Sequence, residues 1–114
     1  MDKNEKCMNL PILTRCEKYF TDKDEKYLCD KKIKNWTKLF YDMELEDLNY
    51  MQNIENVLKK SVSQLTRDDI LTKMTFLLRA DRHGGNRFAT AVSDGSFEAL
   101  CYQLHFVVYF QKGD

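Results

Sequence analysis

Three arginines stand close together in a chain whose basic residues are mostly lysine. Arg79, Arg82 and Arg87 fall within nine residues. The planar guanidinium group forms paired hydrogen bonds with carboxylate, phosphate or carbonyl oxygens, which a lysine ammonium group does not. His83 and Asn86 add polar side chains to the same loop. The sequence therefore predicts a partner-binding site made of Arg79, Arg82, His83, Asn86 and Arg87.

A structural role for the same arginines is the alternative. Carboxylates are available nearby at Asp81, at Asp94 and in the acidic segment 44–55. Arginines paired with these carboxylates would hold the loop in place instead of contacting a partner. A loop between two buried helices is a common location for binding residues, and the sequence leaves both interpretations open.

Side chains suited to nucleophilic catalysis are present, but their spacing does not assemble them. Asp81, His83, Cys101 and His105 supply carboxylate, imidazole and thiol groups. No Gly-x-Ser-x-Gly or P-loop motif accompanies them. Cys101 and His105 are four residues apart, but two ligands do not complete a tetrahedral metal site. We expect no enzymatic activity, no metal and no cofactor.

The four cysteines are Cys7, Cys16, Cys29 and Cys101. An even number allows two disulfides, but no secretory signal precedes them. We therefore expect reduced thiols and a cytoplasmic location, since that compartment keeps cysteines reduced. No run of eighteen apolar residues is present, so we expect no membrane span.

The overall charge is balanced, with 18 basic and 18 acidic residues. Non-specific binding to nucleic acid depends on a surplus of positive charge, which the whole chain lacks. Lysines are nevertheless dense between Lys31 and Lys38. A nucleic-acid-binding protein that uses this lysine face together with Arg79, Arg82 and Arg87 is therefore the alternative function.

The pattern of apolar residues predicts an all-α fold. At 114 residues the chain has room for one domain. We expect a compact bundle of five to six helices over residues 1–114, with residues 1–10 and 111–114 frayed. Apolar residues recur at helical spacing, which places helices over 12–20, 24–43, 45–62, 70–78, 86–93 and 96–110.

Two details of these helices stay open. The helices at 24–43 and 45–62 could be one long kinked helix. The β-branched and aromatic residues at 105–110 also allow a short strand. If this last stretch is exposed, it could serve as a surface for a homodimer.

A pattern of leucine, arginine, glycine and alanine runs through residues 77–104. It comprises Leu77, Leu78, Arg79, Ala80, Arg82, Gly85, Ala91, Asp94, Gly95 and Leu100. This pattern resembles the C-terminal segment of small uncharacterised helical proteins from Gram-positive bacteria and their mobile elements. The resemblance implies helical character and a bacterial or phage source, and it implies no activity.

A helical domain with one arginine-rich loop and no catalytic motif fits a binding protein best. We expect a small non-enzymatic protein-binding module, an adaptor or an inhibitor. Its most specific form would be an accessory or anti-defence factor of a phage or mobile element.

Overall fold

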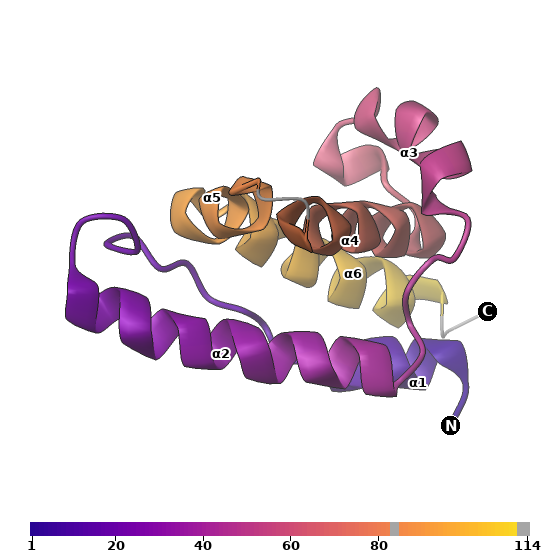
Figure 1. Cartoon of the computed structure of the whole chain (residues 1–114). Coiled ribbons are helices and arrows are strands. Elements are labelled where there is room, and N and C mark those ends of the chain that lie inside the picture. Colours follow the sequence, from indigo (N-terminus) through magenta and orange to yellow (C-terminus); the bar gives the residue numbers. More distant parts are fainter. Residues whose placement is uncertain (83–84, 112–114) are drawn as a thin grey trace.

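The computed structural model describes residues 1–82 and 85–111, which form six α-helices and no strand. The helices are α1 (Lys3–Asn9), α2 (Lys23–Asp42), α3 (Tyr50–Leu58), α4 (Arg67–Arg82), α5 (Arg87–Asp94) and α6 (Ser96–Gln111), with a 3₁₀ turn at Val62–Gln64. Helix α2 runs along one side of the molecule, and α4, α5 and α6 lie across from it (Figure 1). The predicted all-α bundle is confirmed. None of these helices is long and apolar enough to cross a membrane.

Four buried aromatic rings join α2 to α5 and α6. The Trp36 ring stacks on Phe40 with centroids 5.2 Å apart and meets Phe97 edge-on at 4.8 Å. Phe88 and Phe97 also meet edge-on, at 4.7 Å. Edge-on and offset-stacked arrangements are the favourable ones for aromatic pairs. These rings are 2% exposed or less, so they form the centre of the core.

The prediction of a helix over residues 12–20 is wrong. The chain between α1 and α2 is extended and turned, because neighbouring groups take up its polar atoms. The Trp36 Nε1–H donates to the Pro11 carbonyl at 2.9 Å, and the Arg15 backbone N–H donates to the Glu98 carboxylate at 2.8 Å. A backbone satisfied by tertiary partners does not need helical hydrogen bonds.

Residues 1–10 were expected to fray, but Lys3–Asn9 forms α1. The Asp2 carboxylate accepts a hydrogen bond from the Glu5 backbone N–H at 2.8 Å and so caps the helix. The Cys7 side chain is fully buried and anchors α1, which packs against α6. At the other end, α6 reaches Gln111, and 112–114 lie outside the described residues.

The second long helix is shorter than the predicted 45–62, because the chain first makes a turn. Glu44 has a φ of 56°, in the left-handed region that interrupts a helix. The Asp47 backbone N–H donates to the Thr75 hydroxyl at 2.9 Å, and the Thr72 hydroxyl donates to the Asp47 carboxylate at 2.6 Å. These bonds fix the turn on α4, so α2 and α3 are separate helices.

The remaining helices lie where the sequence analysis placed them, with one difference. Helix α4 extends from Arg67 to Arg82, so the expectation that Arg79 and Arg82 lie on a loop is wrong. At the start of α4, the Thr66 hydroxyl accepts from the Asp69 N–H and the Asp69 carboxylate accepts from the Thr66 N–H. This is a reciprocal cap of the capping-box type, with Asp in place of the usual Glu. Gly95 ends α5 with a φ of 87°. Residues 105–110 continue α6, so the alternative of a strand there is wrong.

A disulfide links Cys16 to Cys29, and it ties the irregular segment before α2 to the helix itself. The expectation of reduced thiols is therefore wrong for this pair. Their Cα atoms are 6.4 Å apart, within the range that a disulfide spans. Cys7 and Cys101 are free and buried.

We predict that Trp36→Ala lowers the free energy of unfolding by about 4 kcal/mol, because it removes the ring at the centre of the core and leaves a cavity. Trp36→Phe is the matched control. It keeps an aromatic ring but leaves the Pro11 carbonyl without its donor, and it should cost about 2 kcal/mol. Chemical denaturation followed by circular dichroism measures both. An average substitution costs about 1 kcal/mol. A smaller loss for Trp36→Ala would contradict the central role of Trp36 in the core.

We predict that the double variant Cys16→Ser/Cys29→Ser loses about 3 kcal/mol of stability in non-reducing buffer, because a cross-link of this loop length restricts the unfolded chain. In the presence of dithiothreitol, the variant and the unmodified protein should unfold alike. Thiol titration of the denatured, non-reduced protein should detect only Cys7 and Cys101. Four reactive thiols would contradict the disulfide.

Candidate partner-binding surfaces

Arg79 points into the structure and pairs with a carboxylate. Its terminal nitrogen donates to the Glu46 carboxylate at 2.7 Å, across the gap between α4 and the turn that precedes α3. Both side chains are partly shielded from solvent, with 32% of Arg79 and 24% of Glu46 exposed. The hydrogen bond to Glu46 raises the pKa of Arg79 above its ordinary value. Arg79 therefore makes a pairing with the acidic segment 44–55, as the structural alternative expected.

Arg87 differs from Arg79 in its exposure. It opens α5, beside the exposed Asn86, and both side chains face solvent. The Arg87 guanidinium lies over the Phe76 ring, 5.3 Å from its centroid. This cation–π contact holds the guanidinium near the ring, and its N–H groups remain able to donate hydrogen bonds. Arg87 and Asn86 are thus available to a partner.

The end of α4 holds the other residues of the predicted site. Asp81 does not pair with an arginine in the described contacts; its carboxylate accepts a hydrogen bond from the Phe88 backbone N–H at 3.3 Å. Burial raises the pKa of Asp81, and the Phe88 hydrogen bond opposes that rise only in part. Arg82 is the last residue of α4, and His83 lies outside the described residues.

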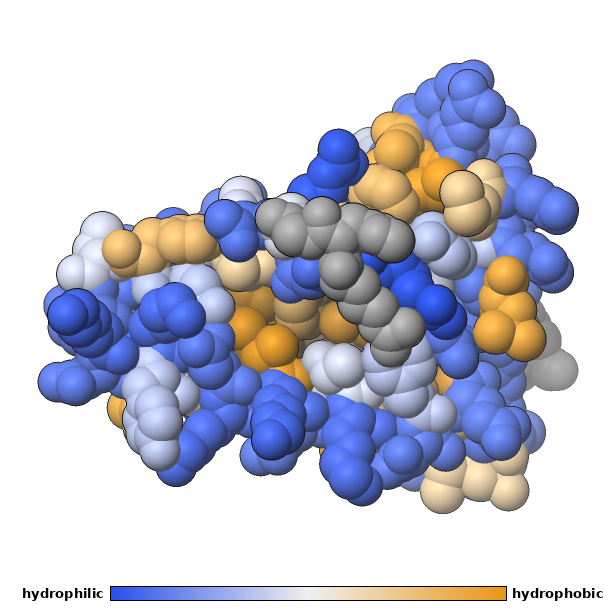
Figure 2. All heavy atoms as spheres, in the orientation of Figure 1, coloured by the Kyte–Doolittle hydropathy of each residue, from blue (hydrophilic) through white to orange (hydrophobic). Residues whose placement is uncertain are grey.

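Two surface hollows share Phe76, and three of the predicted residues line them: Arg79 lies in one, and Asn86 and Arg87 lie in the other. We define the Phe76 groove as two adjoining hollows that meet at this ring. Its lining is Tyr50, Met51, Ile54, Leu58, Phe76, Leu77, Arg79, Ala80, Asn86, Arg87, Thr90, Ala91, Asp94 and Ser96. Met51 is 76% exposed and Leu58 is 52% exposed. Apolar side chains accordingly gather over α3 on the face shown in Figure 2.

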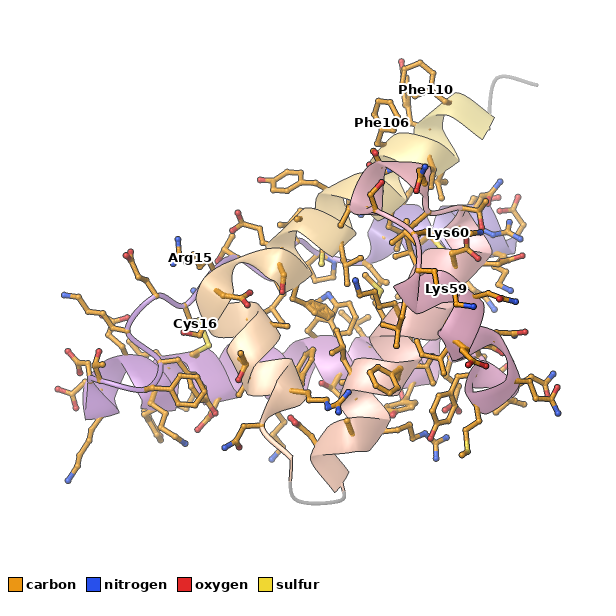
Figure 3. The ribbon with its side chains drawn as sticks, turned by 90° about the horizontal axis from the view of Figure 1, so that it is seen from above. Arg15, Cys16, Lys59, Lys60, Phe106 and Phe110 are labelled. Atoms are coloured by element: carbon orange, nitrogen blue, oxygen red, sulfur yellow. A yellow bond between two sulfur atoms is a disulfide. The ribbon has the colours of Figure 1, made fainter. Side chains whose placement is uncertain are left out.

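A second apolar surface lies on α6, whose two opposite sides are both hydrophobic. One side is buried in the core through Phe97, Leu100, Cys101, Leu104 and Val108. The other side carries the α6 aromatic face, which we define as Tyr102, Phe106, Tyr109 and Phe110, each more than half exposed. The rings of Phe106 and Phe110 lie 4.7 Å apart and project away from the other helices (Figure 3).

Phe76 was not among the residues that the sequence singled out. A continuous helix over 45–62 would place Met51 on its buried side, together with either Val57 or Leu58. Val57 is the buried one of these two, and the expectation for Met51 is wrong. The turn at 43–49 delays the helix to Tyr50–Leu58, so Met51 and Leu58 face outward. The α6 surface did have a signal in the sequence. Glu98 is the only Asp, Glu, Lys or Arg residue in this 16-residue helix, and a helix that is apolar on opposite sides needs a second partner.

Two of the candidate catalytic groups, Cys101 and His105, lie in separate surroundings. The Cys101 thiol is buried, and burial raises its pKa to about 11, so it is protonated at neutral pH. The His105 ring nitrogen Nε2 lies 2.9 Å from the Leu10 carbonyl oxygen. In the part of the chain that the structure describes, no three His, Cys, Asp or Glu side chains form a cluster that could hold a metal ion.

Comparison with known proteins adds no family to this picture. No protein-family model, curated protein or solved structure matches the chain. The resemblance of residues 77–104 to small helical proteins of Gram-positive bacteria stays a prediction. Function is therefore inferred from the two surfaces.

We predict that Arg79→Ala lowers the free energy of unfolding by about 1 kcal/mol, because it leaves the partly shielded Glu46 carboxylate without its partner. Arg87→Ala is the matched control. Its side chain is exposed, so it should cost no more than about 0.5 kcal/mol. Chemical denaturation measures both variants. Equal losses would contradict the division between a structural Arg79 and an available Arg87.

Proposed function

We propose that this protein is a non-enzymatic protein-binding module, an adaptor or an inhibitor, and that its partner binds in the Phe76 groove. The observation that carries the proposal is the composition of this groove. Exposed apolar side chains from α3 lie beside the Phe76 ring, and Asn86 and Arg87 stand at its edge. Methionine, aromatic residues and arginine are the types enriched at protein interfaces.

The apolar part of the groove supports binding through burial. Met51 and Leu58 expose most of their side-chain surface to water. Removing such surface from water stabilises a complex by about 25 cal/mol per Å². Methionine also adapts its shape to a partner, because its side chain is unbranched and flexible. The groove therefore fits an apolar segment, such as one side of an amphipathic helix.

The polar edge of the groove restricts which partner fits. The Arg87 guanidinium is held over Phe76 and suits paired hydrogen bonds to a carboxylate. Arg79 is engaged by Glu46, so it shapes the groove and does not recognise the partner. We therefore expect a partner segment with apolar side chains and an Asp or Glu next to them.

The biological setting rests on the resemblance of residues 77–104, which implies a bacterial or phage source and no activity. The most specific form of the proposal is an accessory or anti-defence factor of a phage or mobile element. The cytoplasmic location expected from the sequence has one observation against it. The Cys16–Cys29 disulfide is more typical of an oxidising compartment.

Nucleic-acid binding is the alternative function, and the exposed lysines of α2 are the observation in its favour. Lys32 and Lys34 are exposed, within the predicted Lys31–Lys38 face. Two other cations of the predicted site are already paired, however. Arg79 binds Glu46, and Lys38 binds Asp42 at 2.8 Å. Fewer free cations release fewer counterions, which weakens binding to a phosphate backbone.

We predict that Arg87→Glu and Met51→Glu each abolish capture of the native partner from a lysate of the source organism. The first places a negative charge where a carboxylate should bind, and the second places a charge in the apolar part of the groove. Affinity capture followed by mass spectrometry identifies the partner, and calorimetry with the purified partner measures the loss. Both positions are exposed, so the variants should melt at nearly the same temperature as the unmodified protein.

Matched control variants lie on α2, away from the groove. Lys34→Glu reverses an exposed charge, and Leu28→Glu places a charge at an exposed apolar position. Both should retain the partner. Capture that survives Arg87→Glu and Met51→Glu would reject the groove as the binding site. A gel shift at low salt that Lys34→Glu weakens would instead support the nucleic-acid alternative.

A further inference from the structure

We infer that the α6 aromatic face is the interface of a homodimer, in which α6 of one copy packs antiparallel against α6 of the other. This surface is separate from the Phe76 groove and shares no residue with it. Tyr102, Phe106, Tyr109 and Phe110 are 58%, 56%, 67% and 62% exposed. Four aromatic side chains this exposed on one side of one helix mark an interaction surface.

The lack of charge on this face favours a second copy as the occupant. An interface with two-fold symmetry brings the same surface patch against itself. A patch with a net charge would repel its own copy. Glu98 is the only Asp, Glu, Lys or Arg residue of α6, and its carboxylate accepts a hydrogen bond from the Arg15 backbone N–H. His105 lies off this face, with its Nε2 2.9 Å from the Leu10 carbonyl oxygen. The aromatic face can therefore meet itself without repulsion.

The shape of the surface indicates the antiparallel arrangement. A shallow hollow lies along the first half of α6, lined by Gly95, Glu98, Ala99, Tyr102, Gln103 and Phe106. Phe110 projects from the other end of the helix (Figure 3). Phe106 lies midway between Tyr102 and Phe110, four residues from each. A two-fold axis at Phe106, perpendicular to the helix, therefore places Phe110 of one copy against the hollow of the other.

The exposed area is sufficient for a small interface. Taking about 200 Å² for a whole aromatic side chain, the exposed parts of the four rings amount to about 500 Å² in each copy. Two copies would bury about 1,000 Å² of aromatic surface, and Ala99 and Gln103 add to this. The total approaches the roughly 1,200 Å² at which specific interfaces begin.

The scaffold holds the face ready for binding. The opposite side of α6 is fixed in the core, where Phe97, Leu104 and Val108 are fully buried. The exposed rings also contact each other, with Tyr109 and Phe110 5.5 Å apart. A rigid helix with mutually packed rings loses little conformational freedom when a second copy binds.

Light scattering coupled to size-exclusion chromatography tests the dimer over a range of protein concentrations. The unmodified protein should approach twice the chain mass of 13.6 kDa. Phe106→Glu places two like charges at the axis and should weaken dimerisation by about 30-fold or more, as loss of a central aromatic residue does. Leu48→Glu is the matched control, because Leu48 is 79% exposed and lies outside α6; it should leave the dimer intact.

Cysteine cross-linking tests the antiparallel arrangement. A mixture of the Tyr102→Cys and Phe110→Cys variants should form an intermolecular disulfide faster than either variant alone, because these positions meet across the axis. Cross-linking of Phe110→Cys with itself at the higher rate would overturn the arrangement. A chain mass of 13.6 kDa at every concentration up to about 1 mM would overturn the dimer and assign the face to a different partner. A dimer that persists in Phe106→Glu would also overturn it.

Discussion

The packing of Trp36 is the interaction on which the rest of the structure depends. Its ring joins α2 to the Phe97 ring of α6 and stacks on Phe40, while its Nε1–H binds the Pro11 carbonyl. One side chain thus attaches the long α2 helix to the other helices and also holds the extended segment between α1 and α2. The cluster also includes Phe97 of α6 and Phe88 of α5. It therefore holds the helix that carries the α6 aromatic face and the helix that begins with Arg87.

The helices that were predicted are those determined by residues close together in the sequence. Helices α2, α4, α5 and α6 each combine an apolar stripe with a nearby start or stop signal, such as the Thr66–Asp69 cap and Gly95. The parts that were not predicted depend on distant partners. Residues 12–20 carry a helical pattern, but hydrogen bonds to α2, α5 and α6 override it. The Cys16–Cys29 disulfide likewise depends on this non-helical path.

The surroundings of the candidate site residues also depend on partners that are distant in the sequence. The concentration of arginine drew attention to this region, but the sequence could not tell which arginine pairs with a carboxylate and which stays exposed. Arg79 meets Glu46, which is 33 residues away, and only the turn held by Asp47 brings that carboxylate into reach. Arg87 stacks on Phe76 and stays exposed. The same residue type therefore has two roles, and burial by the tertiary structure decides between them.

The two surfaces would act together. Each copy carries one Phe76 groove, and the groove and the α6 aromatic face use different residues. A dimer formed through α6 would therefore present two grooves at a fixed separation. A partner that is itself dimeric, or that repeats its binding segment, would then be held at two points. The second contact forms at a high effective concentration, so weak individual grooves suffice for tight binding. Two linked grooves would let a small chain with shallow surface hollows act as the proposed adaptor or inhibitor without a deep pocket.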